Sequence, residues 1–151
     1  MNGPQTLDHA GIAARIPHAG RMCLLDALLG WSPERIRCRA DSHRATDHPL
    51  RSASGLLAPA AIEYAAQAMA LHGALIAPVG SPPTPGYLAS VRDVQLAVPA
   101  LDAVPGALIV DAERLAGDER QILYRFDVRD EAGAAVASGR ATVVLNALPA
   151  A

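Results

Sequence analysis

The sequence contains no lysine, because all 13 of its basic residues are arginine. Chemistry that needs a lysine amine, such as Schiff-base formation, is therefore excluded. Aromatic residues make up only 3% of the chain, which argues against a surface that stacks nucleic-acid bases. The formal net charge of -2 gives no general attraction to nucleic acid or to an anionic membrane. Neither is expected as a partner.

Cysteine is also scarce, and both cysteines, Cys23 and Cys38, lie in apolar stretches. Neither belongs to a Cys-x-x-Cys motif, so the sequence predicts buried free thiols in a reducing compartment. No apolar run reaches the roughly 18 residues of a membrane span, and the first residues lack the pattern of a signal peptide. We therefore expect a cytoplasmic protein with no membrane insertion.

The residues that are present suit a single domain. The chain has 151 residues, 51% of them hydrophobic, which is enough for one sizeable core. No internal repeat or low-complexity linker divides it. We expect one domain over 1–151 with an ordered core at about 15–146.

A long helix is predicted over 57–77. Pro59 suits a first helical turn, because its missing N–H would have no intrahelical partner there. Alanine is abundant, and no glycine interrupts the segment before Gly73. The segment is apolar on nearly every face apart from Glu63, so we expect the helix to be buried all round.

Alternation of polar and apolar residues predicts strands on both sides of this helix. Before it, a helical turn runs into a strand at 22–31, and arginines alternate with apolar residues at 35–40. After it, strands are expected at 86–98, 107–114, 121–129 and 134–146, joined mostly by tight turns. A fully apolar helix needs a sheet that curves around it. The pattern therefore predicts an α+β fold, an antiparallel β-sheet wrapped around one long central helix.

Three parts of the chain resemble the β-hydroxyacyl-(acyl carrier protein) dehydratases, which have the hotdog fold. Residues 16–18 (Ile-Pro-His) with 22–26 are similar to the N-terminal segment of that family. Residues 48–49 (His-Pro) and 63–68 (Glu-Tyr-Ala-Ala-Gln-Ala) are similar to its catalytic loop and helix, and 86–91 to the strand that follows. The resemblance covers about 15–145 and is closest to the dehydratases of aryl-polyene and polyketide-type clusters.

This resemblance implies an activity and two catalytic residues. The activity is dehydration of a 3-hydroxyacyl thioester to a trans-2-enoyl thioester, as in fatty-acid or polyketide biosynthesis. The substrate is carried on the phosphopantetheine of an acyl carrier protein, and no metal or organic cofactor is needed. His48 would remove the C2 proton, because histidine exchanges protons near neutral pH. Glu63 from the other subunit of a dimer would act on the C3 hydroxyl.

Four further residues are expected to contact the substrate or to support the site: Leu57, Ala58, Tyr64 and Gln67. Gln67 lies one helical turn after Glu63 and would brace it. The N-terminus of the helix offers backbone N–H groups suited to a thioester oxyanion, and Ala58 or its neighbours would supply the donor, since Pro59 has no N–H. The partner subunit could be a second copy or a related hotdog chain.

Two other functions remain open from the sequence. A hotdog thioesterase would use water to attack the thioester carbonyl in a similar pocket. A non-catalytic hotdog subunit would bind acyl chains or complete the active site of a partner.

The remaining histidines are expected to be structural. His18 is interpreted as a loop contact, and His72 as a residue at the end of the helix, on nearly the opposite face from Glu63. His43 and His48 with Asp47 lack the spacing and the fourth ligand of a metal site.

The arginines at 35, 37 and 39 have two interpretations. They are either a solvated strand face or a docking patch for an acidic carrier protein or its phosphopantetheine phosphate.

Overall fold

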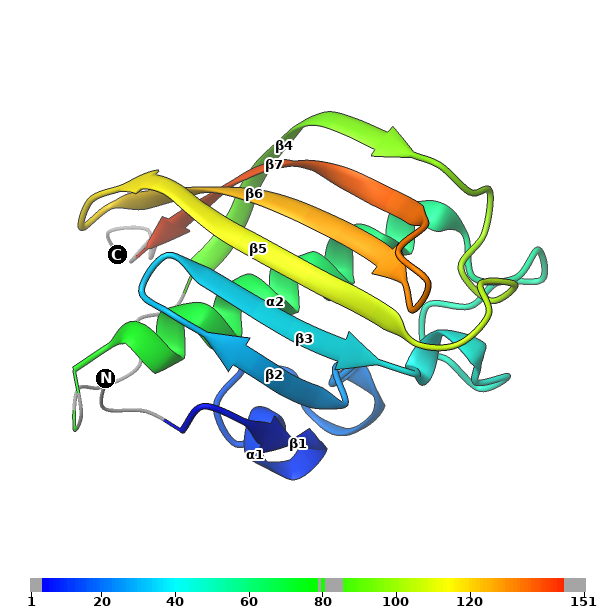
Figure 1. Ribbon diagram of the computed structural model, residues 1–151, viewed down its shortest axis with the longest axis horizontal. Coiled ribbons are helices and arrows are strands. Elements are labelled where there is room, and N and C mark those ends of the chain that lie inside the picture. The colour runs from blue at the N-terminus through cyan, green and yellow to red at the C-terminus, as the bar shows by residue number, and fades with distance from the viewer. Residues whose placement is uncertain (1–3, 79, 81–85, 146–151) are drawn as a thin grey trace, which may run out of the picture.

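One antiparallel sheet and one long helix dominate the computed structural model, which describes residues 4–78, 80 and 86–145 (Figure 1). The strand order is β1-β2-β3-β5-β6-β7-β4. The strands are β1 (Leu7–Asp8), β2 (Ala27–Trp31), β3 (Arg35–Ala40), β4 (Gly86–Leu96), β5 (Leu108–Gly117), β6 (Gln121–Asp130) and β7 (Ala135–Leu145). The helices are α1 (His9–Ala13) and α2 (Ala61–Ile76), with short 3-10 turns η1 (Gly20–Met22), η2 (Ser42–Arg44) and η3 (Ala58–Ala60).

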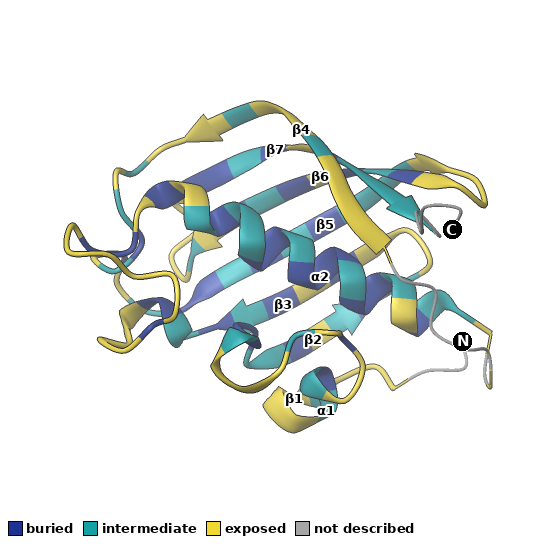
Figure 2. Cartoon of the chain, turned by 180° about the vertical axis from the view of Figure 1, so that it is seen from behind, coloured by how far each residue is buried: buried dark blue, intermediate teal, exposed yellow. Residues whose placement is uncertain are grey.

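The sheet curves around α2, as the apolar character of that helix predicted (Figures 1 and 2). Alternate residues of β6 point toward the helix and are buried, and these are Ile122, Tyr124, Phe126 and Val128. The residues between them face away from α2. The predicted α+β architecture with one central helix is confirmed.

The expectation that α2 is buried all round is wrong. A stripe along the helix is at least partly exposed, formed by Ile62, Glu63, Ala66, Ala70 and Ala74. These positions recur every three or four residues and so lie on one face. The sheet covers only the opposite face, because α2 packs against β3, β5 and β6. The only carboxylate of the helix therefore reaches solvent.

Strand β4 forms one edge of the sheet, next to β7 only. Leu88, Val91 and Leu96 are opposite β7 residues that pack toward the core, so they face the same side as α2. All three are nevertheless exposed, because β4 extends past the helix (Figure 2). The edge thus carries unpaired backbone groups beside an uncovered apolar surface.

The interpretation of His72 as a residue at the helix end also needs correction. Its side chain is fully buried, with Nδ1 at 2.8 Å from the Tyr124 hydroxyl and Nε2 at 2.7 Å from the Ser32 carbonyl oxygen. Burial lowers the pKa of His72, although the Ser32 contact opposes this effect. His72 therefore ties α2 to β6 and to the turn after β2.

The other helix and strand boundaries lie within a few residues of those predicted from the sequence. Strand β1 was not anticipated, because two residues are too short for a pattern. The prolines of 78–85 predict an extended loop between α2 and β4, and this segment lies mostly outside the described residues. Both cysteines are free and buried, as predicted, and burial raises the pKa of Cys38 to about 12. No helix within the described ranges is long and apolar enough to cross a membrane.

Candidate active site

His48 lies in the loop between η2 and η3, and its residue surface is only 5% exposed. The backbone N–H of Leu50 donates to Nδ1 at 3.0 Å. The neutral ring must therefore carry its proton on Nε2. Nε2 lies 3.0 Å from the Tyr64 hydroxyl and so donates to it. Both ring nitrogens of His48 are engaged within the chain.

The hydrogen bond from His48 to Tyr64 belongs to a series of hydrogen bonds in which each group donates to the next. The Ser42 hydroxyl donates to the Leu24 carbonyl at 2.8 Å, so its oxygen accepts from Tyr64 at 2.7 Å. The Leu50 N–H can only donate and the Leu24 carbonyl can only accept, which fixes every donor between them. Burial raises the pKa of Tyr64 to about 12, so the phenol stays protonated.

The surroundings of His48 favour its neutral form. Burial is the largest cause of its lowered pKa, and the nearby His43 and Arg51 lower it further, whereas Asp47 opposes them. Protonating Nδ1 would also break the bond from Leu50. His48 is therefore a neutral Nε2–H imidazole at physiological pH.

Glu63 is held by one of its two oxygens. Oε1 lies 3.1 Å from His18 Nε2 and accepts from Gln67 Nε2 at 3.2 Å. Oε2 makes no hydrogen bond within the described part of the chain. The side chain of Glu63 is 32% exposed and that of His18 25%. The carboxylate is thus fixed in orientation while one oxygen stays accessible.

Gln67 connects Glu63 to the N-terminal segment. Its side chain is fully buried. Nε2 donates to the Met22 carbonyl at 2.6 Å, and Oε1 accepts from the Leu24 N–H at 2.8 Å. The expected contact between Gln67 and Glu63 is present, and the same amide anchors the loop that leads into β2.

His48 and Glu63 are not joined by any hydrogen bond or ion pair within the residues described. His48 contacts Tyr64 on the covered face of α2, whereas Glu63 lies on the exposed stripe. The two predicted catalytic residues of one chain therefore lie apart, and we call the surroundings of each a half-site.

One of the expected oxyanion donors is already used by the fold. The Ala58 N–H donates to the Pro99 carbonyl at 3.1 Å, which leaves the neighbours of Ala58 as the predicted donors. The Ala58 amide is engaged because residues 56–58 pair with the segment after β4. Leu57 beside it is 47% exposed. Tyr64, which was also expected to contact the substrate, is fully buried.

Two residues of these half-sites were missed or underestimated from the sequence. His18 is more than a loop contact, since it pairs with Glu63, and its place in the family-like segment 16–18 was the available signal. Ser42 links Tyr64 to Leu24, and nothing in its neighbourhood pointed to this role.

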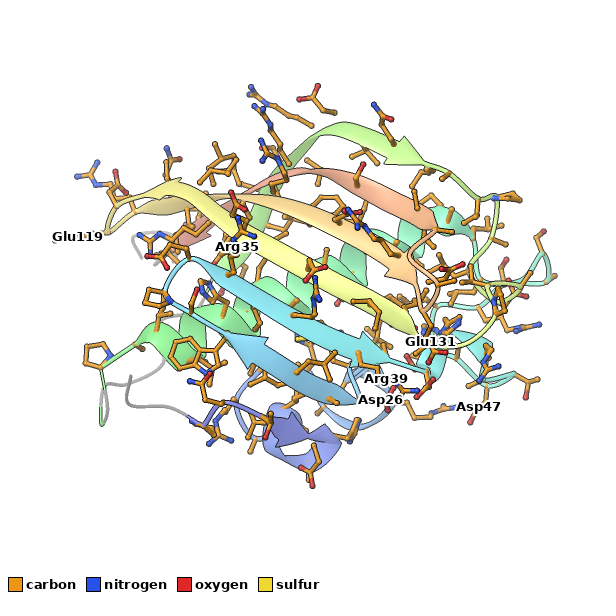
Figure 3. The ribbon with its side chains drawn as sticks, in the orientation of Figure 1. Asp26, Arg35, Arg39, Asp47, Glu119 and Glu131 are labelled. Atoms are coloured by element: carbon orange, nitrogen blue, oxygen red, sulfur yellow. The ribbon has the colours of Figure 1, made fainter. Side chains whose placement is uncertain are left out.

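The arginine stripe of β3 is neutralised by neighbouring acids on the outer face of the sheet (Figure 3). Arg35 pairs with Glu113 at 2.8 Å and Arg37 with Asp111 at 2.7 Å. Arg39 pairs with Asp41 and with Glu131. This arrangement favours the solvated-face interpretation over an anion-docking patch. In addition, no cluster of three or more potential metal ligands occurs within 4–78, 80 and 86–145.

The family model of the ApeP dehydratases matches residues 10–150. The chain belongs to the ApeP-like dehydratase family. No curated protein matches it. Family membership confirms the predicted relation to dehydratases and supports a lyase activity for this ApeP-like chain.

Solved structures share the hotdog fold of this ApeP-like chain. The dehydratase heterocomplex ApeI:P from Xenorhabdus doucetiae has a TM-score of 0.74 at 22% identity, covering 89% of this chain and 90% of that one. A mutant of thioesterase PA1618 from Pseudomonas aeruginosa has a TM-score of 0.63 at 11% identity, covering 96% and 98%. Thioesterase HI1161 from Haemophilus influenzae has 0.57 at 15%, covering 78% and 76%.

Proposed function

We propose that this chain is a subunit of a hotdog dehydratase that converts 3-hydroxyacyl-(acyl carrier protein) thioesters to trans-2-enoyl thioesters. The observation that carries the proposal is Glu63, the only carboxylate of α2, which is partly exposed and has one oxygen held and one without a hydrogen bond among the described residues. Membership of the ApeP-like dehydratases supports the reaction class. No metal or organic cofactor takes part in the proposed reaction.

In the proposed mechanism Glu63 protonates the leaving C3 hydroxyl through Oε2. His18 and Gln67 hold Oε1, which leaves Oε2 as the oxygen that passes the proton to the hydroxyl. His48 removes the C2 proton. Because the only lone pair of its neutral ring is on Nδ1 and accepts from the Leu50 N–H, that contact must open when substrate binds, whereas Nε2–H can stay on Tyr64.

A second hotdog subunit is part of this proposal. The open edge of β4 and its exposed Leu88, Val91 and Leu96 would be covered by a strand added alongside. The two half-sites of one chain would then be completed by those of the other. The solved ApeI:P dehydratase is a heterocomplex, which supports a partner of this kind. The acyl group would approach on phosphopantetheine past the exposed Leu57.

The engaged nitrogens of His48 favour a second candidate function. If the contacts with Leu50 and Tyr64 persist in the complex, this chain provides Glu63 to a histidine of its partner and performs no base chemistry itself. The chain would then be a subunit that completes a partner's active site.

An assay of water loss distinguishes these functions. Purified chain, alone and with a co-expressed hotdog subunit, is incubated with a 3-hydroxyacyl-carrier protein, and products are identified by mass spectrometry. The variants are Glu63→Gln and His48→Asn, with Glu119→Gln on the exposed β5–β6 turn as the matched control.

The dehydratase proposal expects enoyl product from the wild type and from the control, and none from either site variant. Loss of activity in Glu63→Gln alone would identify the site-completing subunit. Full activity in Glu63→Gln would refute the assignment. Formation of free acid would identify a thioesterase.

A further inference from the structure

Three arginines lie side by side on the outer face of the sheet, on the strands nearest its open edge. Arg125 on β6 is directly opposite Arg140 on β7, and Arg140 is directly opposite Arg92 on β4. All three are exposed, and their chain neighbours on β6 and β7 are buried, so they point away from α2. We call these residues the arginine row. Like charges directly opposite one another destabilise a sheet, so the arginine row should lower the stability of the isolated chain.

The acids near the arginine row are engaged elsewhere. Glu113 is opposite Arg125 but pairs with Arg35 at 2.8 Å. Asp127, two residues from Arg125, pairs with Arg129 at 2.6 Å. No ion pair within the described residues involves any member of the row. On the outer face, each arginine of β3 therefore pairs with an acid, whereas the arginines of the row do not.

The remaining polar groups along this edge do not compensate the row. Ser90 and Thr142 are opposite each other on one side of it, and Gln95 and Ser138 on the other, and all four are uncharged. Asp93 is the only acid on β4, where the strand bulges with a φ of 53°, and no ion pair joins it to Arg92. The uncompensated charge therefore ends at the open edge, where a partner strand would lie.

Self-pairing would bring two arginine rows together. Val91 is the middle residue of β4, so antiparallel pairing of two copies about that point places Ser90 of one copy opposite Arg92 of the other. The two Arg92 side chains then lie on a diagonal of about 7 Å on the same face. Arg140 and Arg125 of each copy follow directly behind. Six cations would gather at the seam between identical chains.

We propose that the arginine row selects a different subunit over a second copy of this chain. The fitting partner is a related hotdog chain whose edge strand carries acidic side chains on the outer face, where they compensate Arg92 and Arg140. The row thus acts against the wrong pairing while favouring the right one. This inference rests on the part of the proposed function that adds a second hotdog subunit along β4.

The test measures self-association of the full chain by sedimentation equilibrium at low and at high NaCl concentration. For the wild type we expect weak self-association that tightens several-fold in high salt, because salt screens repulsion between the rows. Arg140→Glu creates an alternating row and should tighten self-association about tenfold at low salt, with salt now weakening it. Arg120→Glu, an exposed arginine on the β5–β6 turn, is the matched control and should behave as wild type. Val91→Lys should prevent association in both backgrounds if β4 is the seam.

A tight wild-type dimer at low salt that weakens in high salt would overturn the inference. So would an Arg140→Glu variant that associates no better than wild type. Sedimentation requires no turnover, so the result stands apart from the outcome of the dehydration assay.

Discussion

Replacing Gln67 by methionine should destabilise the fold strongly although the volume of the side chain hardly changes. The amide bonds to the Met22 carbonyl, to the Leu24 N–H and to Glu63. Methionine fills similar space but offers no comparable donor or acceptor. The Met22 carbonyl and the Leu24 N–H would lose their hydrogen-bond partner, and their burial keeps water from replacing it.

The magnitude follows from these two backbone groups. A buried donor or acceptor left without a partner costs about 1–3 kcal/mol. The Leu24 contact is buried and the Met22 contact is partly buried, so we expect a loss of about 2–5 kcal/mol in the free energy of unfolding. This is a large part of the roughly 5–15 kcal/mol typical of a domain. With a urea m-value of about 2 kcal/mol/M, the midpoint should fall by about 1–2.5 M.

The assay is equilibrium urea unfolding of wild type, Gln67→Met and the control Gln121→Met, in which an exposed glutamine at the start of β6 is changed. The control should shift by less than about 0.5 kcal/mol. If Gln67→Met unfolds at the wild-type midpoint with an unchanged m-value, the amide does not anchor the N-terminal segment to α2. A lowered m-value would instead indicate that this segment detaches before the rest unfolds.

Three further outcomes are expected from buried polar groups and close packing. Tyr64→Phe should cost about 1–3 kcal/mol in urea unfolding, because its hydroxyl bridges two groups, and a loss under 0.5 kcal/mol would contradict this series of hydrogen bonds. Burial lowers the pKa of His43, His48 and His72 in the folded chain, so the unfolded chain binds more protons. The free energy of unfolding should therefore be highest above pH about 6.5 and fall as the pH drops below that value. Urea midpoints at pH 7.5 and 5.5 test this, and a higher midpoint at the lower pH would contradict it. Gly139→Ala should lower the thermal unfolding midpoint, because the added Cβ would lie 2.9 Å from the ring of Phe126. An unchanged midpoint would show that this ring moves aside without cost.

The sheet could be predicted because its residues alternate regularly. Ile122 and Tyr124 are buried while Arg125 is exposed, which is what a period of two requires. The helix was recognised from Pro59 and the alanines that follow. Its exposed stripe was not predicted, because an apolar residue such as Ala66 gives the same sequence pattern whether its own chain or a partner covers it.

The site was predicted less completely, for a related reason. Glu63 and Gln67 lie four residues apart on one helix, so their contact follows from helix geometry. The partners of His48 come from segments that only the tertiary fold brings together. Ser42 reaches Tyr64 across 22 positions of the chain. The use of the Ala58 amide by Pro99 likewise depends on a pairing that no local pattern encodes.

The exposed stripe of α2 has a consequence for the abundance of this chain in a cell. If the proposed partner covers this stripe as well as β4, it binds only the folded state and stabilises the fold by mass action. At a hundred times its dissociation constant, such a partner would add about 2.7 kcal/mol. Chains made in excess of the partner would lack this contribution and would expose an open strand edge to aggregation and proteolysis. Balanced synthesis of the two subunits would then determine how much of this protein persists.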